Sequence, residues 1–84
     1  MKPEDLKAIK RRAEKATSGP WTVGEHHGVD FPEAVLYDIA CNTNDITDEI
    51  YLKEDADFIA HARTDVPALV EEVERLQLAL ALKL

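Results

Sequence analysis

DADFIAHARTDVPALVEEVERLQLALALKL, residues 55–84, carries the strongest pattern in this 84-residue sequence. From residue 62 onward, apolar residues recur at alternating spacings of four and three, which is typical of a helix that packs along another helix. These residues are Ala62, Val66, Leu69, Val73, Leu76 and Leu80. A second strip, formed by Val70, Leu78 and Leu82, widens the apolar surface beyond what one sheet face would cover. We therefore expect an oligomerising helix with a heptad seam formed by Val66, Leu69, Val73, Leu76 and Leu80.

A proline interrupts this helical pattern. Val66 precedes Pro67 and is therefore pushed away from helical backbone angles. Thr64 or Asp65 can cap a helix that starts just after them. The C-terminal third is therefore predicted to form two helices that meet at a bend over residues 63–67.

The N-terminal region has the features of a short amphipathic helix. Pro3 is tolerated in a first helical turn, and the acidic residues that follow it favour the positive end of the helix macrodipole. Leu6 and Ile9 begin an apolar face that continues through Ala13 and Ala16. We expect Gly19 to end this segment by adopting a left-handed conformation.

The middle of the chain changes to a two-residue period, which is typical of strands. Trp21, Val23 and Glu25 alternate with Thr22 and Gly24 at the start of a first strand, and a loop includes residues 24–32. Residues 34–41 are partly apolar on both faces, so they are predicted to form the central strand. After a turn at residues 42–45, a third strand includes Ile46, Ile50 and Leu52.

Together these patterns predict one α+β domain over residues 1–84. It has a helix in residues 1–17, a three-stranded antiparallel meander in residues 20–53 and two helices in residues 55–84. A chain this short buries only about 60–65% of the surface that its unfolded form exposes. A second copy would supply the missing burial, so we expect a homodimer or a higher symmetric oligomer.

Composition narrows the functional classes. Cys41 is the one cysteine, which excludes an internal disulfide and a site built from several cysteines. The N-terminus lacks the apolar core of a secretory signal. The apolar tract at residues 76–84 is shorter than the ~20 residues of a membrane span. We therefore expect a cytoplasmic protein without a membrane partner.

The net charge of −7 is distributed unevenly along the chain. Residues 1–16 hold six of the ten Lys and Arg residues with three acids, a charge of +3. Residues 17–84 hold four basic and 14 acidic residues, a charge of −10. An acidic body repels phosphate backbones, so general nucleic-acid binding is disfavoured. The basic N-terminal helix could still hold a small anion.

Two motifs carry a resemblance to a known family. They are Ala16-Thr17-Ser18-Gly19-Pro20-Trp21 and, in residues 55–69, DADFIAHARTDVPAL. They resemble short bacteriophage and prophage proteins similar to the ead-like family, which have an A-T-P-G-P-W turn and an N-D-A-x-F-I-A-x-A-R motif before a coiled helix. Ser18 stands where this group usually has proline, and Lys53-Glu54 where it often has Asn. The resemblance implies a phage-encoded, non-essential accessory protein in the host bacterial cytosol.

Polar residues inside these two motifs are the candidates for a recognition surface. They are Trp21, His61, Arg63, Thr64 and Asp65. A structural role competes with recognition at each of them: Arg63 and Asp65 can clamp the predicted bend, and Trp21 can be a core or interface residue. A host protein or a small nucleotide is the kind of partner that such a surface would bind.

Catalytic and metal-binding signatures are weak. A zinc site would have to combine His26 or His27 with His61 and Cys41, without any of the usual ligand spacings. Cys41 as a nucleophile is disfavoured because acidic neighbours raise the pKa of a thiol. Glu54, Asp55 and Asp57 could suggest a Mg²⁺ site, but a helix cap at Asp55 with further acids in the first turn explains the same residues. We expect no cofactor and no metal.

These observations lead to one expected function and two alternatives. We expect a non-enzymatic phage accessory protein that binds, and thereby inhibits or sequesters, a host defence protein or its small-molecule signal. One alternative is an acidic mimic of DNA that blocks a DNA-binding protein. The other is a small metal-dependent enzyme that uses the histidines and aspartates.

Overall fold

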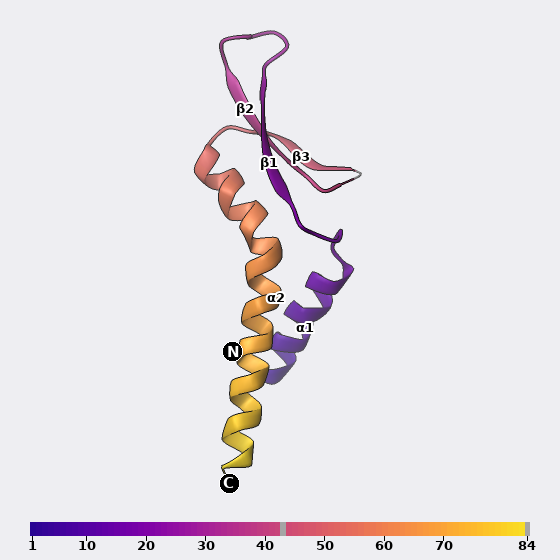
Figure 1. The fold of residues 1–84 in the computed structure, drawn as a ribbon, viewed down its shortest axis with the longest axis vertical. Coiled ribbons are helices and arrows are strands. Elements are labelled where there is room, and N and C mark those ends of the chain that lie inside the picture. The colour runs from indigo at the N-terminus through magenta and orange to yellow at the C-terminus, as the bar shows by residue number, and fades with distance from the viewer. Residues whose placement is uncertain (43, 84) are drawn as a thin grey trace.

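The computed structural model describes residues 1–42 and 44–83 (Figure 1). Its helices are α1 (Pro3–Lys15) and α2 (Lys53–Leu82), and its strands are β1 (Thr22–His27), β2 (Val35–Ala40) and β3 (Asp45–Ile50). The predicted α+β class, with a helix followed by three antiparallel strands, is confirmed.

The sheet has the order β1-β2-β3, with β2 in the centre as predicted. The loop predicted to include residues 24–27 is wrong, because β1 pairs with β2 from Thr22 through His27. Gly24 lies opposite Asp38 in this pairing, and a Cβ atom there would be 2.5 Å from Asp38 Oδ1. Glycine at this position leaves room for the Asp38 carboxylate and does not form a turn. The turn predicted at residues 42–45 includes Thr43, which lies outside the described residues.

A bulge distorts the pairing of β2 with β3. Tyr37 pairs with Ile50 and Ile39 with Thr47, so β3 holds one more residue than β2 over this interval. Glu49 has a φ of 57°, a left-handed conformation that residues other than glycine seldom adopt. Bulges of this kind bend the strand and redirect side chains.

The prediction of two C-terminal helices is wrong: α2 is one helix of 30 residues with Pro67 inside it. Proline lacks the N–H that would bond to the carbonyl of Arg63, which weakens a helix by about 3 kcal/mol. Packing of α2 against α1 on both sides of this position offsets the loss, since Val66, Pro67 and Val70 all line hollows between the two helices. The expected cap at Asp55 is also wrong, because Asp55 lies in the first turn and Leu52 is the N-cap.

The buried core is small and divided between two places. Ile39 from β2 and Ala56 and Ala60 from α2 are buried where α2 contacts the sheet. Leu6 and Val70 are buried between α1 and α2. No other apolar side chain in residues 1–42 and 44–83 is as fully buried as these five.

The molecule is elongated along α2. Figure 1 shows the sheet at one end of this helix, α1 beside its middle and the C-terminal turns extending past α1. The chain measures 62 × 23 × 18 Å with a radius of gyration of 17.2 Å. A compact chain of this length would have a radius of gyration of about 12 Å. Much of α2 therefore has no neighbouring element within the same chain.

Candidate functional site

The carbonyl oxygen of Thr17 joins two of the predicted recognition residues. Trp21 Nε1 donates a hydrogen bond to Thr17 O at 3.0 Å, and Arg63 Nε donates one to the same oxygen at 2.9 Å. We call Thr17, Trp21 and Arg63 the Thr17 clamp. It holds the segment between α1 and β1 against the middle of α2, and a hollow of about 250 Å³ lies beside it.

Gly19 lies against this clamp. No described glycine has a positive φ, so the left-handed conformation expected at Gly19 is wrong. A Cβ atom at Gly19 would instead lie 2.9 Å from Arg63 Cγ. The glycine therefore gives the Arg63 side chain room to reach Thr17 O.

The remaining recognition candidates are separated from the clamp. His61, Thr64 and Asp65 are all exposed, and His61 Nδ1 lies 2.8 Å from the carbonyl oxygen of Asp57 one turn earlier. Successive residues of a continuous helix are rotated by about 100°. Arg63 therefore faces α1 while these three side chains lie on other sides of α2.

We expect replacement of Arg63 by alanine to lower the free energy of unfolding by about 1 kcal/mol, because Thr17 O would lose a charged donor. Chemical denaturation measures this loss. Arg75→Ala is the matched control, since Arg75 pairs with Glu72 on the exposed side of α2, and the substitution should change stability by less than about 0.5 kcal/mol. Equal stability of R63A and the unaltered protein, together with loss of partner binding, would assign Arg63 to recognition instead.

The heptad seam divides into two parts. Leu69, Leu76 and Leu80 are 63%, 48% and 66% exposed. Val66 and Val73 are half-buried and line an apolar hollow of about 210 Å³ between α1 and α2. Leu69 also lines this hollow although it is largely exposed, whereas Leu76 and Leu80 do not border α1.

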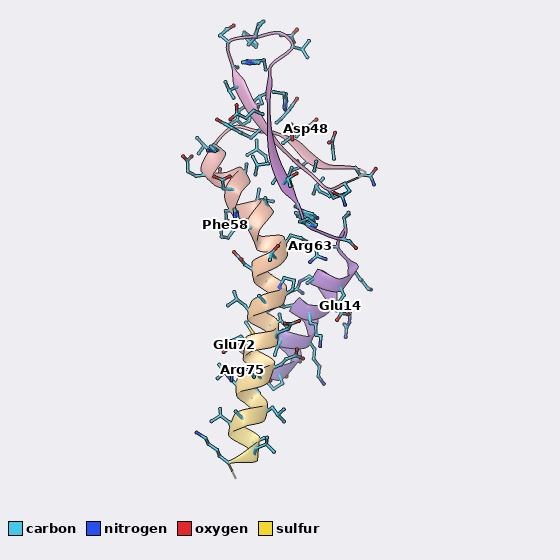
Figure 2. The ribbon with its side chains drawn as sticks, in the orientation of Figure 1. Glu14, Asp48, Phe58, Arg63, Glu72 and Arg75 are labelled. Carbon is cyan, nitrogen blue, oxygen red and sulfur yellow. The ribbon has the colours of Figure 1, made fainter. Side chains whose placement is uncertain are left out.

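Two ion pairs flank the seam. Lys10 Nζ of α1 lies 3.1 Å from Glu74 Oε2 of α2, and the hydrogen bond with Glu74 raises the pKa of Lys10. Arg75 pairs with Glu72 on the same helix and lowers the pKa of that carboxyl group (Figure 2). Two of the acids beside the seam therefore have cationic partners within the chain. Three of the basic residues of α1 remain exposed at its C-terminal end: Arg11, Arg12 and Lys15.

The candidate metal ligands are dispersed. His26 Nδ1 lies 3.2 Å from Asp38 Oδ2, and Cys41 Sγ donates to the carbonyl oxygen of Asn44 at 3.4 Å. Within residues 1–42 and 44–83, no three side chains of His, Cys, Asp or Glu come together as a metal site would require. No observation in the described part of the chain favours the metal-dependent enzyme.

Two hollows contain residues that were not among the candidate site residues. Leu6 and Ile9 of α1 form the opposite wall of the apolar hollow beside the seam. Exposed Phe31 and Tyr51 line a hollow of about 290 Å³ beside the β1–β2 hairpin. The helical spacing of Leu6 and Ile9 predicted a buried face but could not identify its neighbour.

No described helix has both the length and the apolar character that crossing a bilayer requires. Comparison of the chain with protein-family models, curated proteins and solved structures gave no match.

Proposed function

We propose that this chain is a phage or prophage accessory protein that acts by binding, as a symmetric homo-oligomer assembled through the heptad seam of α2. Its binding partner would be a host component, such as a defence protein or a small-molecule signal, that it inhibits or sequesters. The phage setting depends on the sequence resemblance. The binding role is supported by an exposed apolar surface.

The observation that carries the proposal is the imbalance between exposed and buried apolar residues on α2. Leu69, Leu76 and Leu80 are exposed along one side of the helix, whereas Ala56, Ala60 and Val70 are its buried residues. Burying a leucine side chain is favourable by about 1.5–3 kcal/mol. A contiguous apolar surface of this kind is typical of a protein interface.

Self-association is tested by light scattering and sedimentation of the full chain over a wide range of concentration. At high concentration we expect a mass of two or more chains, each of 9.4 kDa. A folded monomer of 9.4 kDa at every concentration would contradict the oligomer.

The host-binding role needs a second measurement. The tagged full chain is incubated with a lysate of infected host cells, and captured proteins and nucleotides are identified. We expect one component to be retained by the unaltered chain and by Arg75→Ala, and lost from an assembly-deficient variant. If every captured component is retained equally by a folded control protein of similar charge, the proposed role fails.

A DNA mimic is the second candidate, because the acidic side chains are accessible. Of the 14 acids in residues 17–84, all are exposed except Asp38, Asp57 and Glu74, which are half-buried. An acidic surface that replaces phosphates would release a DNA-binding partner steeply as salt concentration rises. An apolar contact through the seam would be retained at high salt. Partner capture at low and high salt therefore separates the two functions.

A further inference from the structure

We propose that the C-terminal segment of α2, residues 76–82, lies in the apolar groove between α1 and α2 of a second copy, in an antiparallel dimer with its two-fold axis near Val73. This inference depends on the proposed self-association and specifies its geometry. We call residues 76–82 the α2 tip, and the hollow lined by Leu6, Ile9, Val66, Leu69 and Val73 the α1–α2 groove.

The α2 tip is apolar on two opposite sides. Leu76 and Leu80 lie on one side, and Leu78 and Leu82, two residues further along in each case, are rotated from them by about 200°. Leu78 and Leu82 are 61% and 77% exposed. A helix that is apolar all round is normally buried on all sides. A single partner helix would cover Leu76 and Leu80 and leave the other two leucines in water.

The α1–α2 groove offers two helical walls. Leu6 and Ile9 form one wall, and Val66, Leu69 and Val73 form the other. A helix lying in a groove between two helices contacts both of them, so it can bury two of its sides. The α1–α2 groove can therefore bury both apolar sides of the α2 tip. A simple pair of α2 helices would bury only one of them.

The spacing along α2 lets both grooves be filled at once. Val66 and Leu80 are each seven residues from Val73, which corresponds to about 10 Å along the helix. A two-fold axis near Val73 therefore places Leu80 of each copy beside Val66 of the other. Such an interface limits the assembly to two copies, because the two-fold rotation that places one α2 tip in a groove also places the other.

The accessible surface of the single chain is large enough for this dimer. It is 6684 Å², whereas a compact monomer of 9.4 kDa would expose about 5,000 Å². The excess of about 1,700 Å² is greater than the roughly 800 Å² that each partner buries in a standard interface. The chain thus has surface to lose on association without unfolding any element.

Charges near the proposed axis do not oppose the dimer. Glu72 pairs with Arg75 and Glu74 pairs with Lys10 within one chain. Glu71 lies two residues before Val73, so it is rotated about 200° away from the axis. Residues 76–82 themselves contain no charged side chain. The two chains therefore meet through apolar side chains.

Disulfide trapping tests this geometry in the full chain with Cys41→Ser as background. Val66→Cys and Leu80→Cys are made in separate chains, which are mixed, unfolded, refolded together and oxidised. A disulfide needs Cα atoms within about 7 Å. We expect a covalent dimer in the mixture and none from L80C alone, because the two Leu80 positions would lie about 20 Å apart.

Asp48→Cys in the same background is the control, since Asp48 lies on β3, at the opposite end of α2 from the α2 tip, and should give no covalent dimer (Figure 2). Circular dichroism checks that each variant keeps its helices. A covalent dimer from L80C alone would place the two Leu80 positions side by side and overturn the inferred axis near Val73 while the proposed oligomer stands. An oligomer without the mixed disulfide would also overturn the inference. A chain that is folded but monomeric would contradict both this inference and the proposed self-association.

Discussion

Replacing both Leu69 and Leu76 with glutamate is expected to abolish the proposed self-association. Both side chains are exposed on the heptad seam of the single chain. Each buried leucine contributes about 1.5–3 kcal/mol, and each variant would also place a charge in an apolar contact. We expect the dissociation constant to rise more than about 1,000-fold, equivalent to about 4 kcal/mol. Light scattering would then report monomers, or unfolded chains if the isolated chain is too unstable to persist.

A charge-matched control separates loss of the seam from added charge. Thr64 and Ala68 are also exposed on α2, but they are rotated away from the leucines of the seam. Thr64→Glu with Ala68→Glu adds the same two charges to the same helix and should leave the oligomer intact. A stable oligomer of unchanged mass in the double leucine variant would contradict the role of the seam.

Replacing Ile39 with alanine is expected to cost about 2–5 kcal/mol of folding free energy. Ile39 is fully buried, and it is the largest side chain of the described residues to be so. It lies on the central strand where α2 contacts the sheet, so its truncation would leave a cavity in one of two already small cores. A domain of this size has only about 5–10 kcal/mol of stability in total. Urea denaturation followed by circular dichroism measures the loss.

Val35→Ala provides the comparison on the same strand. Val35 is exposed near the hairpin, so its truncation should cost less than about 1 kcal/mol. If I39A and V35A proved equally stable, the contact between α2 and the sheet would not be the core of the domain. The helix would then be held chiefly by α1.

Sequence patterns were sufficient to predict the start of α1 and the central position of β2. The α1 helix follows from Pro3, the early acids and an apolar face that includes Leu6, and the structure begins this helix at Pro3. The central position of β2 follows from apolar residues on both faces, since only a strand with neighbours on both edges and α2 across it can bury a residue such as Ile39. Both predictions depend on residues close in sequence.

The bend at Pro67 shows where local patterns failed. Proline preference is a property of a short segment, and it favours ending the helix at Val66. The structure continues the helix because α1, distant in sequence, packs along α2 on both sides of Pro67. Residues 61–65 lie within this helix, so its rotation of about 100° per residue separates Arg63 from His61, Thr64 and Asp65. These four recognition candidates are therefore distributed around one continuous helix.

The sequence predicted two residues of the Thr17 clamp as candidates but not the contact that joins them. Trp21 and Arg63 were singled out because they belong to two matching motifs, but nothing in the pattern indicated that both would donate to one carbonyl oxygen. Nor did it show that Gly19 lies against Arg63. Contacts between residues 46 positions apart depend on how α1 is placed beside α2.

By itself the sequence determined the α+β class, the central strand, the start of α1 and the apolar period of α2, because each depends on the preferences of neighbouring residues. Only the tertiary structure decided that α2 is one helix and that Val66, Leu69 and Val73 line a groove beside α1 while Leu76 and Leu80 face outward. The physical reason is that α1 covers one side of α2 for part of its length. Which apolar residues remain exposed depends on that packing and not on their spacing.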